Sequence, residues 1–300
     1  MSKTAKWILG IIAFLVVIFG LMMISVVLWI FSDDNDETTS TSGDKVAVVE
    51  LKETIVSSED VVRQFKKYED NHSVKAIVFR VESPGGGVAA SQEIFEEVKK
   101  IRNAGKPIVV SMGSVAASGG YYVSCPATKI FANPGTLTGS IGVIIEFMHF
   151  KELMNKIGVD ETTIKTGKFK DIGSPYRKTT EEEKAYFQFV IGDVYNQFVD
   201  AVATERKLDR AHVVQYADGR VFTGRQALEY GFVDTLGTFE DAVKYAAKLG
   251  KITGKPSVVK EGKKKSLIDR IVGDATSEVT KIREQFLQQP MLQYRFSATN

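Results

Sequence analysis

The sequence has few of the residues on which many active sites depend. Its 300 residues include three histidines, His72, His149 and His212, and one cysteine, Cys125. The histidines have no nucleophile motif beside them, which gives poor support for a Ser-His-Asp arrangement. One cysteine excludes an intramolecular disulfide, and its small, apolar surroundings favour a buried structural thiol. Neither His-Glu-x-x-His nor Gly-x-x-x-x-Gly-Lys-[Ser/Thr] occurs, so no metal or nucleotide cofactor is implied.

The charges of the sequence are nearly balanced. The formal net charge of +2 comes wholly from Lys3 and Lys6, because without them 37 basic residues face 37 acidic ones. A neutral remainder argues against nucleic acid as the main partner. With 44% hydrophobic and 25% charged residues, the chain can hold a globular domain of normal core size together with further elements.

One long segment, Trp7 to Phe31, contains no charged residue. As a helix it would be about 37 Å long, enough to cross a hydrocarbon core of about 30 Å with some tilt. A cleaved signal peptide is the alternative, but no small-x-small site occurs before Asp33. Because Lys3 and Lys6 precede the segment and an acidic run follows it, we expect a single-pass anchor in the cytoplasmic membrane. The N-terminus would be cytoplasmic and the rest of the chain extracytoplasmic.

Residues 1–31 contain the N-terminus and the expected anchor. The composition of the remaining sequence divides it into three parts. Residues 32–44 are acidic and polar, as in a flexible linker, and residues 251–300 combine a basic linker, an amphipathic stretch and a tail. Residues 45–250 alternate short β-branched runs with amphipathic stretches. Strands are expected at 46–51, 76–81, 107–112, 129–132 and 141–145, and helices at 58–68, 89–104 and 115–124. This alternation predicts an α/β domain with a mostly parallel, buried sheet.

Two short segments carry the chemistry that the sequence offers. Ser114 to Tyr122 places serines among residues too small to block a substrate, and Gly167 to Asp171 contains two lysines. A serine becomes a nucleophile when a nearby base takes its proton, and a lysine is such a base when its ammonium form is disfavoured by burial. The combination predicts a Ser-Lys hydrolase. The alternatives are a helix cap, for which Ser114 is better suited than Ser118, and a solvated surface lysine.

Four motifs together resemble a known family. Ser83-Pro-Gly-Gly-Gly87, Ala116-Ala-Ser-Gly-Gly120, the segment from Asn133 to Gly142 and Gly167-Lys-Phe-Lys-Asp171 occur in the order of the short form of the bacterial signal peptide peptidase A family, also called SppA. The resemblance runs from about Val46 to about Leu249. It implies that Ser118 is the nucleophile, Lys170 the general base and Ser140 the hydroxyl that orients the lysine amine. It also implies an oxyanion hole from the amides of Gly85 or Gly86 and of Gly119, with Lys168 as the alternative base.

The resemblance also implies a fold. The family's repeated strand-strand-helix units form the spiral shared by Clp protease subunits and enoyl-CoA hydratases. One alternative function is therefore a crotonase-like acyl-CoA enzyme, which an extracytoplasmic site disfavours. A second alternative is a non-catalytic membrane scaffold with a protease-like fold.

The rest of the sequence predicts packing and assembly. Thr180 to Leu208 is typical of a long amphipathic helix whose apolar stripe packs in the core, and residues 219–234 resemble a family segment near the cleft. An amphipathic helix from Leu267 to Phe286 and an apolar tail through Phe296 have no obvious partner in the pattern. We leave open whether the tail docks on a neighbouring subunit, enters the cleft or frays.

These observations lead to one functional prediction. We expect a membrane-anchored serine endopeptidase, without cofactor, that cleaves remnant signal peptides and other extended apolar peptides. Because no separate lid domain is evident to restrict access, we also expect a homo-oligomer, as in Clp-like rings.

Overall fold

A computed structural model describes residues 3–32, 43–261 and 293–296 of the chain. The chain divides into two compact units, Met1–Thr41 and Ser42–Asn300. Helix α1 (Lys3–Ser32) belongs to the first unit, and the other elements named below belong to the second. The predicted helix from Leu267 to Phe286 lies outside the described residues.

Helix α1 contains the segment expected to be the anchor. Its described apolar side chains, such as Trp7 and Phe14, are exposed. The side chains of residues 26–31 lie outside the described part of the chain. Among the helices that the structure describes, none has the length and apolarity that a membrane crossing needs. The anchor stays a prediction.

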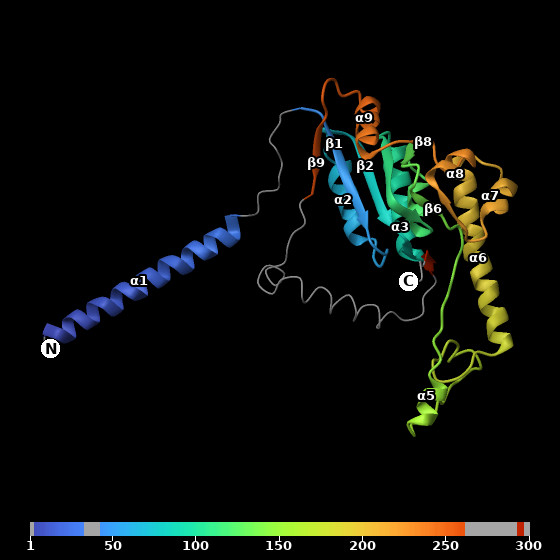
Figure 1. Cartoon of the computed structure of the whole chain (residues 1–300), viewed down its shortest axis with the longest axis horizontal. Helices are drawn as coiled ribbons and strands as arrows, with labels where there is room; N and C mark the ends of the chain where they lie inside the picture. The colour runs from blue at the N-terminus through green and yellow to red at the C-terminus, as the bar shows by residue number, and fades with distance from the viewer. Residues whose placement is uncertain (1–2, 33–42, 262–292, 297–300) are drawn as a thin grey trace. The chain divides into compact units, whose positions relative to one another are not determined.

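An eight-stranded sheet forms the centre of the second unit (Figure 1). Its parallel middle consists of β1 (Lys45–Lys52), β2 (Val74–Ser83) and β4 (Ile108–Ala117). The order is β7–β6–β4–β2–β1–β9, while β5 pairs with β4 and β8. The outer strands are β5 (Lys129–Ala132), β6 (Leu137–Gly139), β7 (Val221–Thr223), β8 (Thr235–Leu236) and β9 (Ser257–Lys260). Pairing within the described sheet is parallel except between β6 and β7, which confirms the predicted mostly parallel α/β class.

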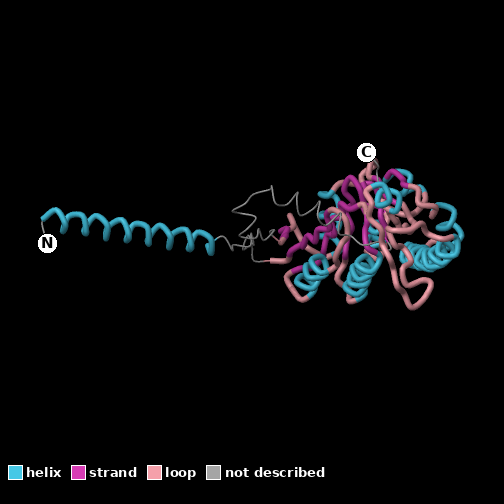
Figure 2. The backbone as a smooth tube through the Cα atoms, turned by 90° about the horizontal axis from the view of Figure 1, so that it is seen from below, coloured by secondary structure: helices cyan, strands magenta, loops and turns pink. Residues whose placement is uncertain are grey.

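Helices cover both faces of this sheet (Figures 1 and 2). Alternate residues of β1 point to opposite faces, as the pleat requires. Val46 and Val48 join a core cluster with α9 (Phe239–Leu249), whereas Ala47 and Val49 join the larger cluster with α2 (Glu59–Glu69) and α3 (Val88–Asn103). Burial on both faces explains why the strands are continuous β-branched runs.

An arm, residues 146–190, projects from the second unit. It contains α5 (Lys151–Lys156) and the first half of α6 (Glu181–Arg206), and Figure 1 shows α5 far from the sheet. None of residues 142–182 is buried. The second half of α6 returns to the core through Phe198 and Val202, next to α4 (Gly119–Ser124), α7 (Arg210–Tyr216) and α8 (Gly224–Glu229). The predicted apolar stripe therefore packs in the core over only half of the helix.

Most predicted elements agree with the structure, but two differ. Residues 115–117 continue β4 instead of opening a helix, because they pair with β6. Residues 141–145 form no strand in the sheet; Ile144 makes an isolated bridge with Gln293 of the tail instead. Beyond residue 250, β9 adds an edge strand that pairs in parallel with β1.

Candidate active site

Ser118 stands at the sharp turn where β4 ends and α4 begins. Its backbone has φ 53° and ψ −116°, and its N–H donates to the carbonyl of Gly139 at 2.7 Å. A non-glycine residue in this conformation is strained, and such strain collects at functional sites. Ser118 is the N-cap residue of α4, yet its hydroxyl makes no capping hydrogen bond. The alternative of a helix cap at Ser114 is wrong, because Ser114 lies in β4 and donates its N–H to the Glu82 carboxylate at 2.9 Å.

Glycines let separate chain segments meet beside Ser118. A Cβ on Gly85 would lie 2.6 Å from the amide nitrogen of Gly119, and a Cβ on Gly120 would lie 2.6 Å from the carbonyl oxygen of Ser83. Gly85 also has φ +101°, a conformation that side chains rarely adopt. The two glycine motifs are therefore required for the backbones of Gly85 and Gly119 to come together.

Strand β3 (Gly85–Gly87) lies between two partners. On one side, the Ile55 N–H donates to the Gly85 carbonyl at 2.8 Å and the Gly87 N–H donates to the Ile55 carbonyl at 2.8 Å. On the other side, β10 (Gln293–Arg295) pairs with it antiparallel, with Tyr294 opposite Gly86. The Phe296 N–H extends this pairing to the Pro84 carbonyl at 2.7 Å. Strand β3 is thus a fixed template against which an extended segment binds.

The side chain of Tyr294 anchors the tail strand in the hydrophobic core. Its side chain is fully buried, its ring lies 4.6 Å from Phe198 and 5.1 Å from Tyr122 between centroids, and its hydroxyl donates to the Val194 carbonyl at 3.2 Å. Its own carbonyl oxygen lies beside Gly85 and Gly119, since a Cβ on these glycines would meet it at 1.9 Å and 3.0 Å. The described tail, residues 293–296, thus docks against β3 of its own chain, and Arg295 and Phe296 line the neighbouring cleft.

The cleft has a volume of about 600 Å³ and contains both predicted hydroxyls, Ser118 and Ser140. Ser140 is buried, has φ 50° and donates its N–H to the Arg220 carbonyl at 2.8 Å. Gly219 lines the same cleft, in agreement with the prediction that the segment from residue 219 lies near it, whereas sequence reasoning missed that one face of α6 also lines it. The signal for α6 was a glycine inside the helix, Gly192. These lining residues include Ala217, Asp218 and Gly219, and Gln188, Ile191, Gly192 and Tyr195 of α6.

Lys170 is not among the residues that line this cleft. It lies in the turn Gly167–Ser174 on the arm, where its side chain is exposed. Within the described part of the chain its amine has no hydrogen bond or ion pair, whereas the amine of Lys168 pairs with Glu182 and lies 4.9 Å from the centre of the Phe169 ring. The structure thus brings together Ser118, Ser140 and the three predicted glycines but leaves the predicted base on the arm.

The single cysteine is not part of the site. Cys125 is fully buried, and its thiol donates to the Tyr121 carbonyl at 3.2 Å. Burial raises the pKa of the Cys125 thiol to about 12. Since the thiolate is the reactive form, the interpretation as a structural thiol is confirmed.

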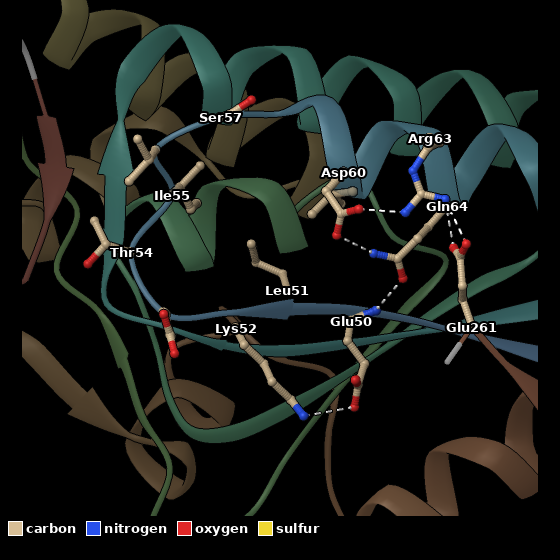
Figure 3. A pocket seen from close by; sticks show the side chains of 13 residues that line it. Glu50, Leu51, Lys52, Thr54, Ile55, Ser57, Asp60, Arg63, Gln64 and Glu261 are labelled. Carbon is tan, nitrogen blue, oxygen red and sulfur yellow. Dashed lines mark hydrogen bonds and ion pairs between the residues drawn. The ribbon is translucent and has the colours of Figure 1, made fainter. Parts of the chain in front are cut away.

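A second hollow, of about 700 Å³, lies beside the loop that carries Ile55 (Figure 3). Its lining contains several charged side chains that pair with one another: Arg63 with Glu261 at 2.8 Å and with Asp60 at 2.5 Å, and Lys52 with Glu50 at 3.3 Å. It contains none of the predicted catalytic residues.

Comparison with known proteins gives two family matches. Residues 100–253 match the model of Peptidase family S49, and residues 44–137 match that of Clp protease. A candidate signal peptide peptidase SppA of Enterococcus faecium is 42% identical over 65% of this chain and 57% of its own length. A candidate protease of Methanocaldococcus jannaschii is 43% identical over 65% of this chain and 62% of its own length. One of Synechocystis is 44% identical over 68% of this chain and 74% of its own length. The chain thus spans about three fifths of the first two relatives.

Proposed function

Because the chain belongs to peptidase family S49 and has a Clp-like, mostly parallel α/β fold, we propose that it is a serine endopeptidase with Ser118 as nucleophile and Lys170 as general base. The Ser118 oxygen attacks the scissile carbonyl carbon while its proton passes to the neutral Lys170 amine. The tetrahedral oxyanion is stabilised by backbone amides of β3 and Gly119. The protonated lysine then gives its proton to the leaving amine, and water releases the acyl group from Ser118.

The observation that carries this proposal is the tail strand. An extended segment of peptide already lies antiparallel to β3, with the carbonyl of Tyr294 beside the backbones of Gly85 and Gly119. A substrate bound in the same register would present its carbonyl next to Ser118. Main-chain pairing accepts many sequences, whereas the pocket around Tyr294 selects for a large apolar side chain.

We propose that Lys170 acts on the Ser118 of a second copy of the chain. The arm that carries Lys170 exposes large apolar side chains, among which Ile164 is 96% exposed. Many large apolar side chains exposed on one projecting segment favour an interaction site there. A homo-oligomer would cover it and bring the lysine turn to a neighbouring cleft. The side chains concerned are Met148, Phe150, Leu153, Ile157, Val159, Ile164 and Phe189.

The setting of the enzyme is also a proposal. The uncharged segment Trp7 to Phe31, preceded by Lys3 and Lys6, supports a cytoplasmic-membrane anchor with the peptidase on the extracytoplasmic side. Remnant signal peptides and other extended apolar peptides near the membrane are then the substrates we propose. The match to Clp protease over residues 44–137 supports the spiral of β-β-α units. Membership in a peptidase family disfavours the acyl-CoA alternative.

Mixed oligomers test the shared site. Full-length Ser118→Ala and Lys170→Ala chains should each be inactive on a fluorogenic peptide. Co-expressed in equal amounts with different tags, they should recover about a quarter of the parental activity, averaged over all assemblies that form at random, because a site is intact only when its serine and its lysine come from different variants. Confirmed mixed oligomers without any recovery would contradict a dyad shared between copies.

A further inference from the structure

Arg177 joins the lysine-bearing turn to the start of helix α6. Its guanidinium donates to both carboxylate oxygens of Asp171, at 2.8 and 2.9 Å, and to the Asp171 carbonyl at 3.1 Å. The same guanidinium donates to both carboxylate oxygens of Glu183, at 2.8 and 2.5 Å. We infer that Arg177 is a positioning residue that fixes the Lys170 turn for catalysis, an inference that rests on the proposed role of Lys170.

Besides this link, the turn has two side-chain contacts with α6, the stacking of the Phe169 ring on Tyr186 at 5.4 Å between centroids and the ion pair of Lys168 with Glu182, and none of these four side chains is buried. Hydrogen bonds within it run from the N–H of Lys170 to Gly167 at 3.1 Å and from the N–H of Ser174 to Asp171 at 3.0 Å. These local bonds set its shape but do not attach it to the rest of the arm. Since none of residues 142–182 is buried, apolar packing does not provide the rigidity of a core. Among these contacts, the ion pair of Arg177 is the one that joins Asp171, the residue next to Lys170, to the buried Glu183 of α6.

The Glu183 end of this link is itself fixed. Glu183 is buried and belongs to the capping box of α6: it accepts from the Thr180 N–H at 2.9 Å, while its own N–H donates to the Thr180 hydroxyl at 3.2 Å. The hydrogen bonds from Arg177 hold the pKa of Asp171 well below its usual range and lower the pKa of Glu183 to about 2. Both carboxylates are therefore ionised at neutral pH, and the two-sided guanidinium link persists under assay conditions.

The link also keeps a carboxylate away from the catalytic amine. Asp171 follows Lys170 directly and is the acidic group nearest to it in the chain. Arg177 and Lys165 already occupy the Asp171 carboxylate, the latter at 2.5 Å. Other arm lysines have carboxylate partners, Lys178 with Glu152 and Lys184 with Glu181, whereas the amine of Lys170 has none within the described residues. Arg177 thus both orients the turn and leaves the Lys170 amine available.

The test compares three full-length variants with a matched control. The link between Arg177 and Asp171 is removed in Arg177→Ala, in Asp171→Asn and in the double variant. The control, Lys184→Ala, removes an exposed ion pair within α6. We expect Arg177→Ala to lower kcat about 10- to 100-fold with KM nearly unchanged, because a base displaced by about 1 Å fails only in the transition state. The double variant should be no worse than Arg177→Ala, and Arg177→Lys should recover part of the loss. Lys184→Ala should behave as the parent.

Three results would overturn the inference: an unchanged kcat in Arg177→Ala, a change confined to KM, or losses from Arg177→Ala and Asp171→Asn that multiply in the double variant. Thermal unfolding and oligomer mass establish that each variant is intact. If Arg177→Ala does not assemble, the nearly isosteric Asp171→Asn variant tests the inference instead, and an unchanged kcat in that variant would overturn it. Failure of the proposed function has a different signature, since Lys170→Ala would then retain activity whatever the Arg177 variants do.

Discussion

The tail strand should inhibit the enzyme, and Tyr294 is the residue through which this can be measured. Its side chain is fully buried between Tyr122 and Phe198, and its hydroxyl donates to Val194. Truncating a buried aromatic costs about 3–5 kcal/mol, and we take about 3 kcal/mol because a terminal strand relaxes easily. That is about a 100-fold shift toward the open cleft. Since substrate binds only the open form, Tyr294→Ala should raise kcat/KM for a short peptide by up to about the same factor.

A graded pair of variants makes this prediction specific. Tyr294→Phe loses only the hydrogen bond to Val194, about 1 kcal/mol, so its kcat/KM should rise roughly fivefold. Deleting residues 266–300 should give at least the effect of Tyr294→Ala, with weaker assembly if the deleted segment also contacts a neighbour. Initial rates with a fluorogenic peptide, at equal oligomer mass, provide the comparison. If Tyr294→Ala has the kcat/KM of the parent, the tail does not compete with substrate.

Two further predictions concern the glycines and the arm. Gly85→Ala should abolish peptidase activity, because Gly85 has φ +101° and its Cβ would lie 2.6 Å from the Gly119 nitrogen. Gly135→Ala should keep the activity, because a Cβ at Gly135 would have no atom within 4 Å. Peptidase assays compare the two variants. A Gly85→Ala enzyme with normal activity would exclude the close approach. Because Arg177 lowers the pKa of Glu183 from 4.5 to about 2, its contribution to stability should be present above pH 4.5 and be lost as the pH falls toward 2. Hydrogen exchange in the first turn of α6 would follow this loss, and protection unchanged down to pH 2 would argue against it.

The fold was predictable where local pattern and burial agree. The run at residues 129–132 is strand β5, and Thr180 begins α6 with the expected acidic first turn. The pattern failed at residues 115–117, whose small side chains have little preference of their own and follow their pairing with β6. It failed again at 141–145, where the partner of Ile144 is a residue 149 positions later in the chain, Gln293. Pairings of this kind depend on tertiary contacts that a local window does not contain.

The site was predictable in its parts but not in its assembly. Motif resemblance selected Ser118, Ser140 and the glycines; the structure places both serines in one cleft and brings Gly85 close to Gly119, the residue after Ser118. It did not predict that Lys170 lies on an exposed arm and outside the lining of the cleft, because a short motif does not contain the tertiary arrangement of the segment that carries it. The pairing of Tyr294 with β3 could not be predicted from the sequence either, because an apolar tail has the same composition whether it frays or binds.

The central claim is that Ser118 is activated by Lys170, and one labelling experiment tests it most directly. The full-length chain is treated with an active-site-directed phosphonate, and the modified residue is identified by mass spectrometry. We expect labelling at Ser118, almost none in Lys170→Ala, and a nearly parental rate in Lys168→Ala, since the Lys168 amine is already paired with Glu182. Undiminished labelling of Lys170→Ala, or its loss in Lys168→Ala, would contradict the assigned base.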